Sequence, residues 1–364
     1  MFIEFSPHND DTIARAPQVA ADTNHKIIYF NYTAHTSRGV LKSQIGKIVE
    51  GIYAKYNKDY CPILLIDSLA EGPSGDDFDF LDSLRQQYPS LNIIHLTSGL
   101  DPETVRYQVV TSYNMFFWPV NSLWQQAFTT TVSHHFIALA RAPKPHRIRF
   151  INSMLNQQLE QFGHFSIGSA ADEYLIEVNT SNYKDYGIDI QNLKHFPTLL
   201  DGPITYDVSS QYGLADSRIT QALLNVVLET SYEFLNSHPD LEAVMWRAPF
   251  LTEKTVKAFA IGQIPLILGP VGQVKMTRDL GFDLFDDIVD HSYDLIVDPY
   301  ARIDQFTNSL KNFINQYPKD SLQELKNTLM PRFIKNLELA KAMHRSNDYE
   351  SKLRNLLQAI PVNE

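Results

Sequence analysis

The stretch from residue 250 to 269 constrains the fold more than any other part of the chain. Thr252 is a favourable N-cap residue, and residues 253–261 carry apolar side chains at helical spacing. Gly262 supplies a helix stop, and the apolar run 264–268 has the length and composition of a buried strand. This stretch therefore predicts a short helix, a tight turn and a strand.

The first half of the chain alternates strand and helix patterns. The predicted strands are 27–32, 63–66 and 91–96, and the predicted helices are 40–56 and 78–88. This alternation predicts an α/β fold with a parallel sheet covered by helices on both faces. In such sheets ligands bind beyond the carboxyl ends of the strands, where we expect the loops 33–39 and 67–75.

The second half of the chain predicts one further strand and several helices. The strand is expected at 221–229, and the helices at 148–162, at 301–316, at 320–343 with an interruption at Pro331, and at 347–359.

A basic, proline-containing segment interrupts these patterns at residues 141–149, and we expect a domain boundary near Pro145. A chain of 364 residues is long enough for two cores. The expected parts are a Rossmann-like domain at 1–145, a second one at 146–335, and a helical tail at 336–364 that packs back on the first domain.

The composition limits the cellular compartments and the binding partners that are compatible with the chain. The formal net charge is −11, so no overall positive field attracts nucleic acid or anionic lipid. The total charge does not exclude a local basic groove. No segment approaches 18 consecutive apolar residues, and the N-terminus lacks a targeting pattern. The single cysteine, Cys61, fits a reducing compartment. We expect a cytoplasmic protein without a membrane span.

The helix predicted at 253–261 carries Lys254 and Lys257 near its start. A helix dipole disfavours cations there by about 0.3–1 kcal/mol each. A bound phosphate would account for these lysines, because backbone N–H groups and ammonium groups would then face one anion. A solvated surface helix accounts for them equally well.

Residues 252–269 also resemble the donor-binding motif of α-1,3-fucosyltransferases and, more closely, of related bacterial and phage proteins. The shared features are Thr252-Glu253-Lys254, an alanine-containing helix, and the Gly-Gln-Ile-Pro and Leu-Gly steps that follow. The resemblance implies that Glu253 holds the ribose hydroxyls of a nucleotide sugar and that Lys254 reaches its diphosphate.

The resemblance extends to segments on both sides of this motif. Pro-His-Arg at 145–147, followed by a helix and by Gly-His-Phe-Ser at 163–166, is similar to an element whose arginine contacts the diphosphate. That role falls on Arg147, because a guanidinium can donate to two phosphate oxygens at once. Asn225 and Glu229 fit the strand of the relatives, and 281–294 fits a further motif except at His291, where the relatives carry Glu.

The resemblance implies a GT-B-like glycosyltransferase, in which two Rossmann-like domains face a central cleft. The donor, a nucleoside-diphosphate sugar with GDP or UDP, would bind the second domain and the acceptor the first. The expected nucleotide-binding residues are Arg147, Asn225, Glu229, Thr252, Glu253 and Lys254.

Transfer of the sugar requires stabilisation of the leaving diphosphate and deprotonation of an acceptor hydroxyl. Arg147, Lys254 and the helix start can supply the first without a metal, so we expect no metal site. The resemblance implies an inverting reaction. The candidates for the catalytic base are Glu71, Asp67 and His35 of the first domain.

Three interpretations of the partner stay open. A glycan acceptor is favoured. A phage enzyme acting on hydroxymethylated DNA bases is an alternative, and it would require a basic groove in the first domain. A noncatalytic nucleotide-binding or interaction protein that keeps only the donor fold is the third.

Overall fold

The computed structural model describes most of the chain. Described are residues 2–5, 27–31, 45–56, 63–68, 75–97, 108–111, 127–140, 144–167, 217–229, 232, 249, 251–345 and 348–360. Contacts within the chain group it into two compact units. Unit 1 comprises Met1–Met115, His238–Phe250 and Arg345–Glu364, and unit 2 comprises Phe116–Ser237 and Leu251–His344. Both contain parallel sheets and helices, which confirms the α/β class.

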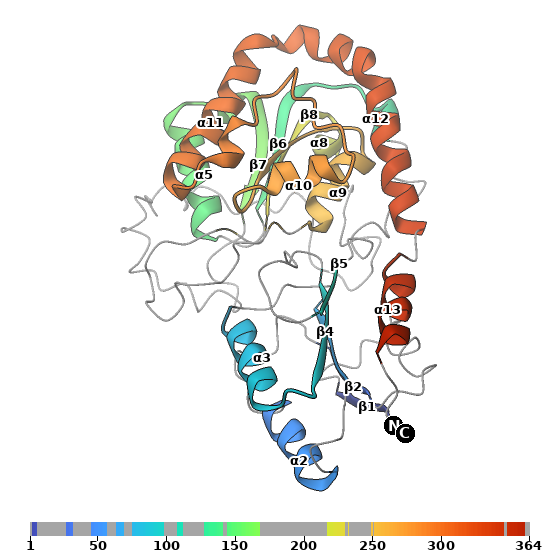
Figure 1. Cartoon of the computed structure of the whole chain (residues 1–364). Helices are drawn as coiled ribbons and strands as arrows, with labels where there is room; N and C mark the ends of the chain where they lie inside the picture. Colours follow the sequence, from blue (N-terminus) through green and yellow to red (C-terminus); the bar gives the residue numbers. More distant parts are fainter. Residues whose placement is uncertain are drawn as a thin grey trace. The chain divides into compact units, whose positions relative to one another are not determined.

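Unit 1 contains a five-stranded parallel sheet in the order β1-β2-β3-β4-β5 (Figure 1). Its strands are β1 (Phe2–Phe5), β2 (Ile27–Asn31), β3 (Ile63–Ser68), β4 (Asn92–Thr97) and β5 (Gln108–Thr111). Its helices are α2 (Gly46–Tyr56), α3 (Gly75–Gln87) and α13 (Asp348–Ala359), of which α13 contacts β5. Three of these strands confirm the predictions, whereas β1 and β5 were not predicted.

The core of unit 1 follows from the apolar runs in its strands. Ile28, Leu64 and Ile66 are buried against Val49 of α2 and Leu81 of α3. Parallel strands are covered on both faces, and for that reason their sequences are apolar almost throughout.

Unit 2 contains a four-stranded parallel sheet in the order β7-β6-β8-β9. Its strands are β6 (His134–Ala140), β7 (Gly163–Ile167), β8 (Ala222–Leu228) and β9 (Ile264–Leu268). Helix α5 (Pro145–Asn156) lies between β6 and β7 in the sequence, and α9 (Glu253–Ala260) lies between β8 and β9. The basic segment 141–149 thus connects β6 to α5 within this unit.

Residues 252–269 fold as predicted. The Thr252 side chain caps α9 by accepting a hydrogen bond from Lys254 N at 3.2 Å. Gly262 ends the helix region with φ of 65°, a backbone conformation that glycine adopts without strain. Phe259 of α9 is buried and stacks on Phe282 with ring centroids 4.1 Å apart.

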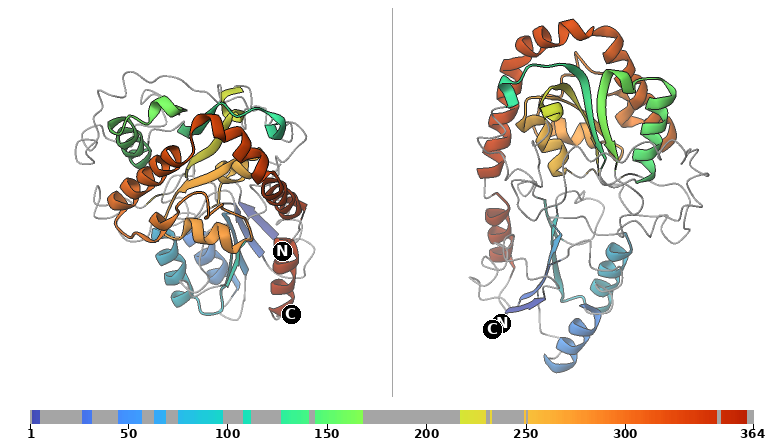
Figure 2. Two further views of the ribbon diagram at one scale, coloured as in Figure 1. Left: turned by 90° about the horizontal axis from the view of Figure 1, so that it is seen from above. Right: turned by 180° about the vertical axis from the view of Figure 1, so that it is seen from behind.

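The remaining helices of unit 2 gather around the sheet (Figures 1 and 2). They are α8 (Ser217–Thr220), α10 (Gln273–Asp279), α11 (Pro299–Gln316) and α12 (Leu322–Arg345), together with the 3₁₀ turns η4 (Ala127–Thr129), η5 (Glu160–Phe162), η9 (Ser292–Leu295) and η10 (Lys319–Ser321). Helix α11 packs against α5.

Two helix predictions require correction. The helix expected at 148–162 begins earlier, at Pro145, and ends at Asn156, after which Gln158 has φ of 56°. The expected break at Pro331 was wrong, because α12 continues through this residue. Leu329, Phe333 and Leu337 are buried on either side of the proline, and this packing offsets the roughly 3 kcal/mol cost of proline inside a helix.

No helix within the described ranges combines the length and the apolar character that a membrane crossing requires.

Candidate functional site

In the sheet of unit 2, the direction in which successive strands are added reverses between β6 and β8. From β6 the chain passes through α5 to β7 on one side, and from β8 it passes through α9 to β9 on the other. The connections that follow β6 and β8 therefore lead to opposite sides of the sheet. Ligands of open parallel sheets bind at such a topological switch point.

Glu229, the first residue after β8, ties the two sides of this switch point together. Its backbone N–H donates to the carbonyl oxygen of Leu268 at 2.9 Å, which continues the β8–β9 pairing. Its carbonyl oxygen accepts hydrogen bonds from Arg147 Nη2 and from His146 Nε2, both at 3.0 Å. The first turn of α5 is thus held on the end of β8.

The carboxylate of the same residue holds the first turn of α9. Oε2 of Glu229 accepts from Thr252 Oγ1, and Oε1 accepts from Thr255 Oγ1, both at 2.6 Å. All three side chains are buried, and hydrogen bonds of this length are typical of hydroxyl groups that donate to an ionised carboxylate. Because Thr252 also caps α9 at Lys254 N, one hydrogen-bonded chain joins Arg147 to the start of α9.

The other predicted site residues are placed differently. Asn225 lies within β8 and donates to Gln263 Oε1 at 2.7 Å, and the Gln263 amide in turn donates to the carbonyl oxygens of Ile219 and Ala222. These partners lie at the amino ends of β8 and β9, so the structure does not bring Asn225 to the switch point. Glu253 begins α9, but its side chain is not among the described features.

The predicted catalytic residues belong to unit 1. Asp67 lies near the end of β3, where it pairs in register with Asn31 and Leu96. Its side chain is outside the description, and Glu71 and His35 lie outside the described residues altogether.

Several residues near the switch point were not assigned a role from the sequence. The imidazole of His146 is buried and stacks on the ring of Tyr232 at 4.9 Å. The Tyr232 hydroxyl donates to the carbonyl oxygen of Pro299 at 2.6 Å, and the guanidinium of Arg302 lies 4.7 Å from the same ring. Arg302, on α11, also donates to the carbonyl oxygen of Ile296. These contacts fix α11 beside the start of α5.

The pKa of His146 reflects its burial and the cations around it. Burial lowers the pKa of His146 well below its usual value, and the charges of Arg147, Lys144 and Arg302 lower it further. The imidazole is therefore neutral at pH 7, and it donates from Nε2.

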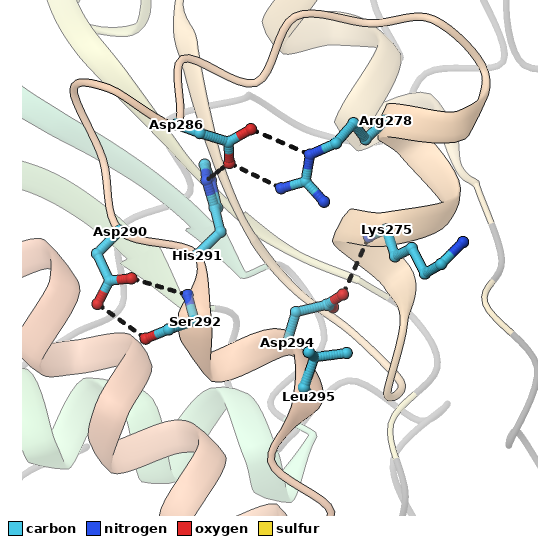
Figure 3. Close-up of a pocket in the computed structure, with 8 residues that line it drawn as sticks. All are labelled: Lys275, Arg278, Asp286, Asp290, His291, Ser292, Asp294 and Leu295. Carbon is cyan, nitrogen blue, oxygen red and sulfur yellow. Dashed lines mark hydrogen bonds and ion pairs between the residues drawn. The ribbon is translucent and has the colours of Figure 1, made fainter.

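A polar pocket of about 460 Å³ lies beside α10 (Figure 3). It is lined by Lys275, Arg278, Asp286, Asp290, His291, Ser292, Asp294 and Leu295. Asp294 accepts from the backbone N–H groups of Val274 and Lys275 at 2.9 and 3.0 Å, and burial raises its pKa. A carboxyl group of the protein therefore already accepts from the N–H groups at the start of α10, and this disfavours binding of a phosphate at the same groups.

The segment that forms this pocket also covers the outer edge of β9. His291 Nε2 lies 3.2 Å from the carbonyl oxygen of Pro265, and the Tyr293 hydroxyl accepts from Ile267 N at 3.1 Å. Side chains thereby satisfy backbone groups that a further strand would otherwise pair. His291 also contacts Asp286 through Nδ1 at 3.0 Å.

In the part of the chain that the structure describes, no group of three or more His, Cys, Asp or Glu side chains could hold a metal ion. The groups that could hold an anionic cofactor are Arg147, Lys144, Lys254 and the backbone at the starts of α5 and α9.

The chain was compared with protein families, curated proteins and solved structures. No protein-family model matches it. No curated protein matches it in sequence. Among solved structures, an α,α-trehalose-phosphate synthase (UDP-forming) from Burkholderia vietnamiensis is similar, with a TM-score of 0.43 and 9% sequence identity over 95% of this chain and 75% of that chain. The fold and the candidate site define an α/β protein in which Arg147 and the first turn of α9 are hydrogen-bonded to the residue that follows β8.

Proposed function

We propose that unit 2 binds the diphosphate of a nucleotide sugar at the β6–β8 switch point and that the chain is a glycosyltransferase. The observation that carries this proposal is the position of Glu229, whose backbone and carboxylate together hold Arg147 and the first turn of α9. One buried residue thus keeps a guanidinium and a helix N-terminus at the same place in the fold.

This arrangement suits a diphosphate for electrostatic reasons. Helix N-termini present unpaired N–H groups and a partial positive charge, and α5 and α9 both begin at the carboxyl edge of the sheet. Arg147 and Lys254 add full charges on the two sides. Because these donors are held in place before the ligand arrives, they stabilise the charge of a leaving diphosphate without reorganising.

The proposed residue roles combine the geometry with the resemblance stated above. Arg147 and Lys254 bind the diphosphate, and Glu253 holds the ribose hydroxyls. Thr252 and Glu229 support these groups from within the fold, since both side chains are buried and bonded to each other. We assign Asn225 to the support of Gln263 rather than to the ligand.

In the proposed inverting reaction, an acceptor hydroxyl oxygen attacks the anomeric carbon while the bond to the diphosphate oxygen breaks. The bonding electrons pass to the diphosphate, and a base takes the hydroxyl proton. Glu71, Asp67 and His35 stay the candidates for that base. No metal is required by this scheme, because cationic side chains carry the leaving charge.

The experiment that tests the proposal is a titration of the protein with GDP, UDP and CDP, each beside its monophosphate, by calorimetry at two salt concentrations. We expect one diphosphate to bind more tightly than its monophosphate and its affinity to fall with salt. The matching nucleotide sugar should then be hydrolysed slowly, with or without EDTA. Failure of every diphosphate to bind would contradict the proposal.

The nature of the acceptor follows from a second measurement with that donor. Transfer to oligosaccharides supports the favoured glycan acceptor, and transfer to hydroxymethylated DNA supports the alternative. Donor binding without hydrolysis or transfer indicates a noncatalytic nucleotide-binding protein.

A further inference from the structure

We infer that Thr255 is a positioning residue that sets the spacing between the starts of α5 and α9, and that this spacing makes the site selective for a diphosphate over a monophosphate. The inference rests on the proposed function, because it concerns the same site.

The position of Thr255 explains why it can act in this way. Its side chain is fully buried, and its hydroxyl donates to Glu229 Oε1 at 2.6 Å. Thr255 follows Thr252 by three residues, so the two hydroxyls lie on one face of α9. Each engages a different oxygen of one carboxylate. Two attachments hold the helix start more tightly than one attachment would, in addition to the packing of Val256 and Phe259.

The backbone of Glu229, the residue that accepts from Thr255, positions α5. The carbonyl oxygen of Glu229 accepts from Arg147 Nη2, so the guanidinium is positioned by the residue that also positions α9. Strands β6 and β8 are direct neighbours, and adjacent strands lie about 4.8 Å apart. Cationic groups that follow neighbouring strands can face two linked phosphates together.

Binding of a monophosphate depends less on the spacing between the starts of α5 and α9. One phosphate can bind to either set of donors alone, so its affinity depends little on how the two sets are spaced. A diphosphate must satisfy both sets at once, and its affinity depends on the Glu229–Thr255 contact. The ratio of the two affinities therefore reports the positioning, whereas a general loss of stability would lower both affinities alike.

The test compares wild-type protein with Thr255→Val and Thr255→Ser. Valine keeps the shape of threonine but removes the hydroxyl, and serine keeps the hydroxyl. The matched control is Thr307→Val in α11, where another fully buried threonine donates one hydrogen bond, to the carbonyl oxygen of Ile303 at 2.9 Å. Dissociation constants for the preferred nucleoside diphosphate and its monophosphate are measured by calorimetry at a temperature at which circular dichroism shows all four proteins folded.

We expect Thr255→Val to weaken diphosphate binding by about tenfold or more and monophosphate binding by much less. Thr255→Ser and Thr307→Val should keep the wild-type ratio of affinities. An unchanged ratio in Thr255→Val, or an equal fall in Thr307→Val, would overturn the inference while leaving the proposed function standing. If the wild-type protein binds no nucleoside diphosphate, both the inference and the proposed function are wrong. If Thr255→Val does not fold, the ratio for Glu229→Gln decides in its place.

Discussion

Arg147 Nη2 donates to the backbone carbonyl oxygen of Glu229 at 3.0 Å, and this contact orients the guanidinium. A carbonyl oxygen carries only a partial charge, whereas a carboxylate in the same place would compete with a phosphate for the guanidinium. The side chain is also buried, so its orientation is fixed by packing as well as by this hydrogen bond.

Replacing Arg147 by methionine should therefore weaken nucleoside-diphosphate binding more than it weakens the fold. A charge-assisted hydrogen bond contributes about 1.5–3 kcal/mol, which corresponds to a loss of affinity of about tenfold or more. Calorimetry measures the loss. Arg85→Met, which changes an exposed arginine in α3, is the control and should bind as the wild type does. Equal affinities for Arg147→Met and wild type would remove Arg147 from the site.

Acid should destabilise unit 2 partly through Asp286. Its hydrogen bond with His291, followed by its bonds to Arg278, holds the pKa of this carboxyl well below its usual value. A carboxyl group whose pKa is lower in the folded state stabilises the fold above its unfolded pKa of about 4, and this stabilisation is lost as the pH falls below that value.

The variant Asp286→Asn tests this dependence. Because the Asp286 side chain is half exposed, we expect the free energy of unfolding to fall by about 1 kcal/mol or less at pH 7. The difference from wild type should shrink between pH 4 and about pH 2. Denaturant titrations across this range measure it, with the exposed Asp320→Asn as control. A difference that stays constant with pH would contradict the ion-pair explanation.

The hydroxyl of Tyr293 should be required for the stability of the outer edge of β9. Tyr293→Phe leaves the buried N–H of Ile267 without its acceptor, which costs about 1–3 kcal/mol. Chemical denaturation measures the loss, and hydrogen exchange should show faster exchange at the Ile267 amide. Tyr317→Phe removes a hydroxyl that accepts from the exposed Gln316 amide at 3.1 Å, and it should change little. Similar stabilities for both variants would argue against the edge contact.

Lys326 should give the protein an alkaline stability dependence. The side chain is buried, its ammonium donates to the carbonyl oxygen of Thr130 at 2.8 Å, and burial lowers its pKa to about 8. Between about pH 8 and pH 10 the unfolded chain holds this proton and the folded chain does not, so this group makes stability rise with pH.

Lys326→Met should abolish that contribution, so its stability should rise less steeply than that of wild type between pH 8 and 10. The difference in slope can reach about 1.4 kcal/mol per pH unit. Thermal or denaturant unfolding at several pH values measures it, and the exposed Lys335→Met should keep the wild-type slope. Parallel curves for Lys326→Met and wild type would show that the lysine stays charged in the folded protein.

The fold was predictable where local signals agreed. Around α9 and β9 an N-cap threonine, helical spacing, a stop glycine and an apolar run all indicate the same boundaries, and the structure confirms them. β6 was not predicted, because its sequence His-His-Phe-Ile-Ala-Leu-Ala directly follows an aromatic-rich region from which its pattern does not stand out. The helix break predicted at Pro331 was wrong, because tertiary packing there overrides the strong tendency of proline to interrupt a helix.

The site was predictable only in part. The resemblance pointed to Arg147, Thr252 and Lys254, and the structure joins them through Glu229. The sequence could not show that the Glu229 carboxylate faces inward, because a strand end can direct its side chain either way. Thr255 carried one usable signal, its spacing from Thr252, whereas Tyr232 and Arg302 acquire their positions only through tertiary contacts.

The central pair of the unit 2 sheet has a consequence for how the protein folds. β6 and β8 are neighbours in space, yet β7 and a long segment separate them in the sequence. Closing so long a loop is entropically costly, so pairing of these strands is expected to come late and to limit the folding rate. During synthesis, α5 and β7 would emerge well before β8, and an unpaired β6 edge would need protection until β8 arrives.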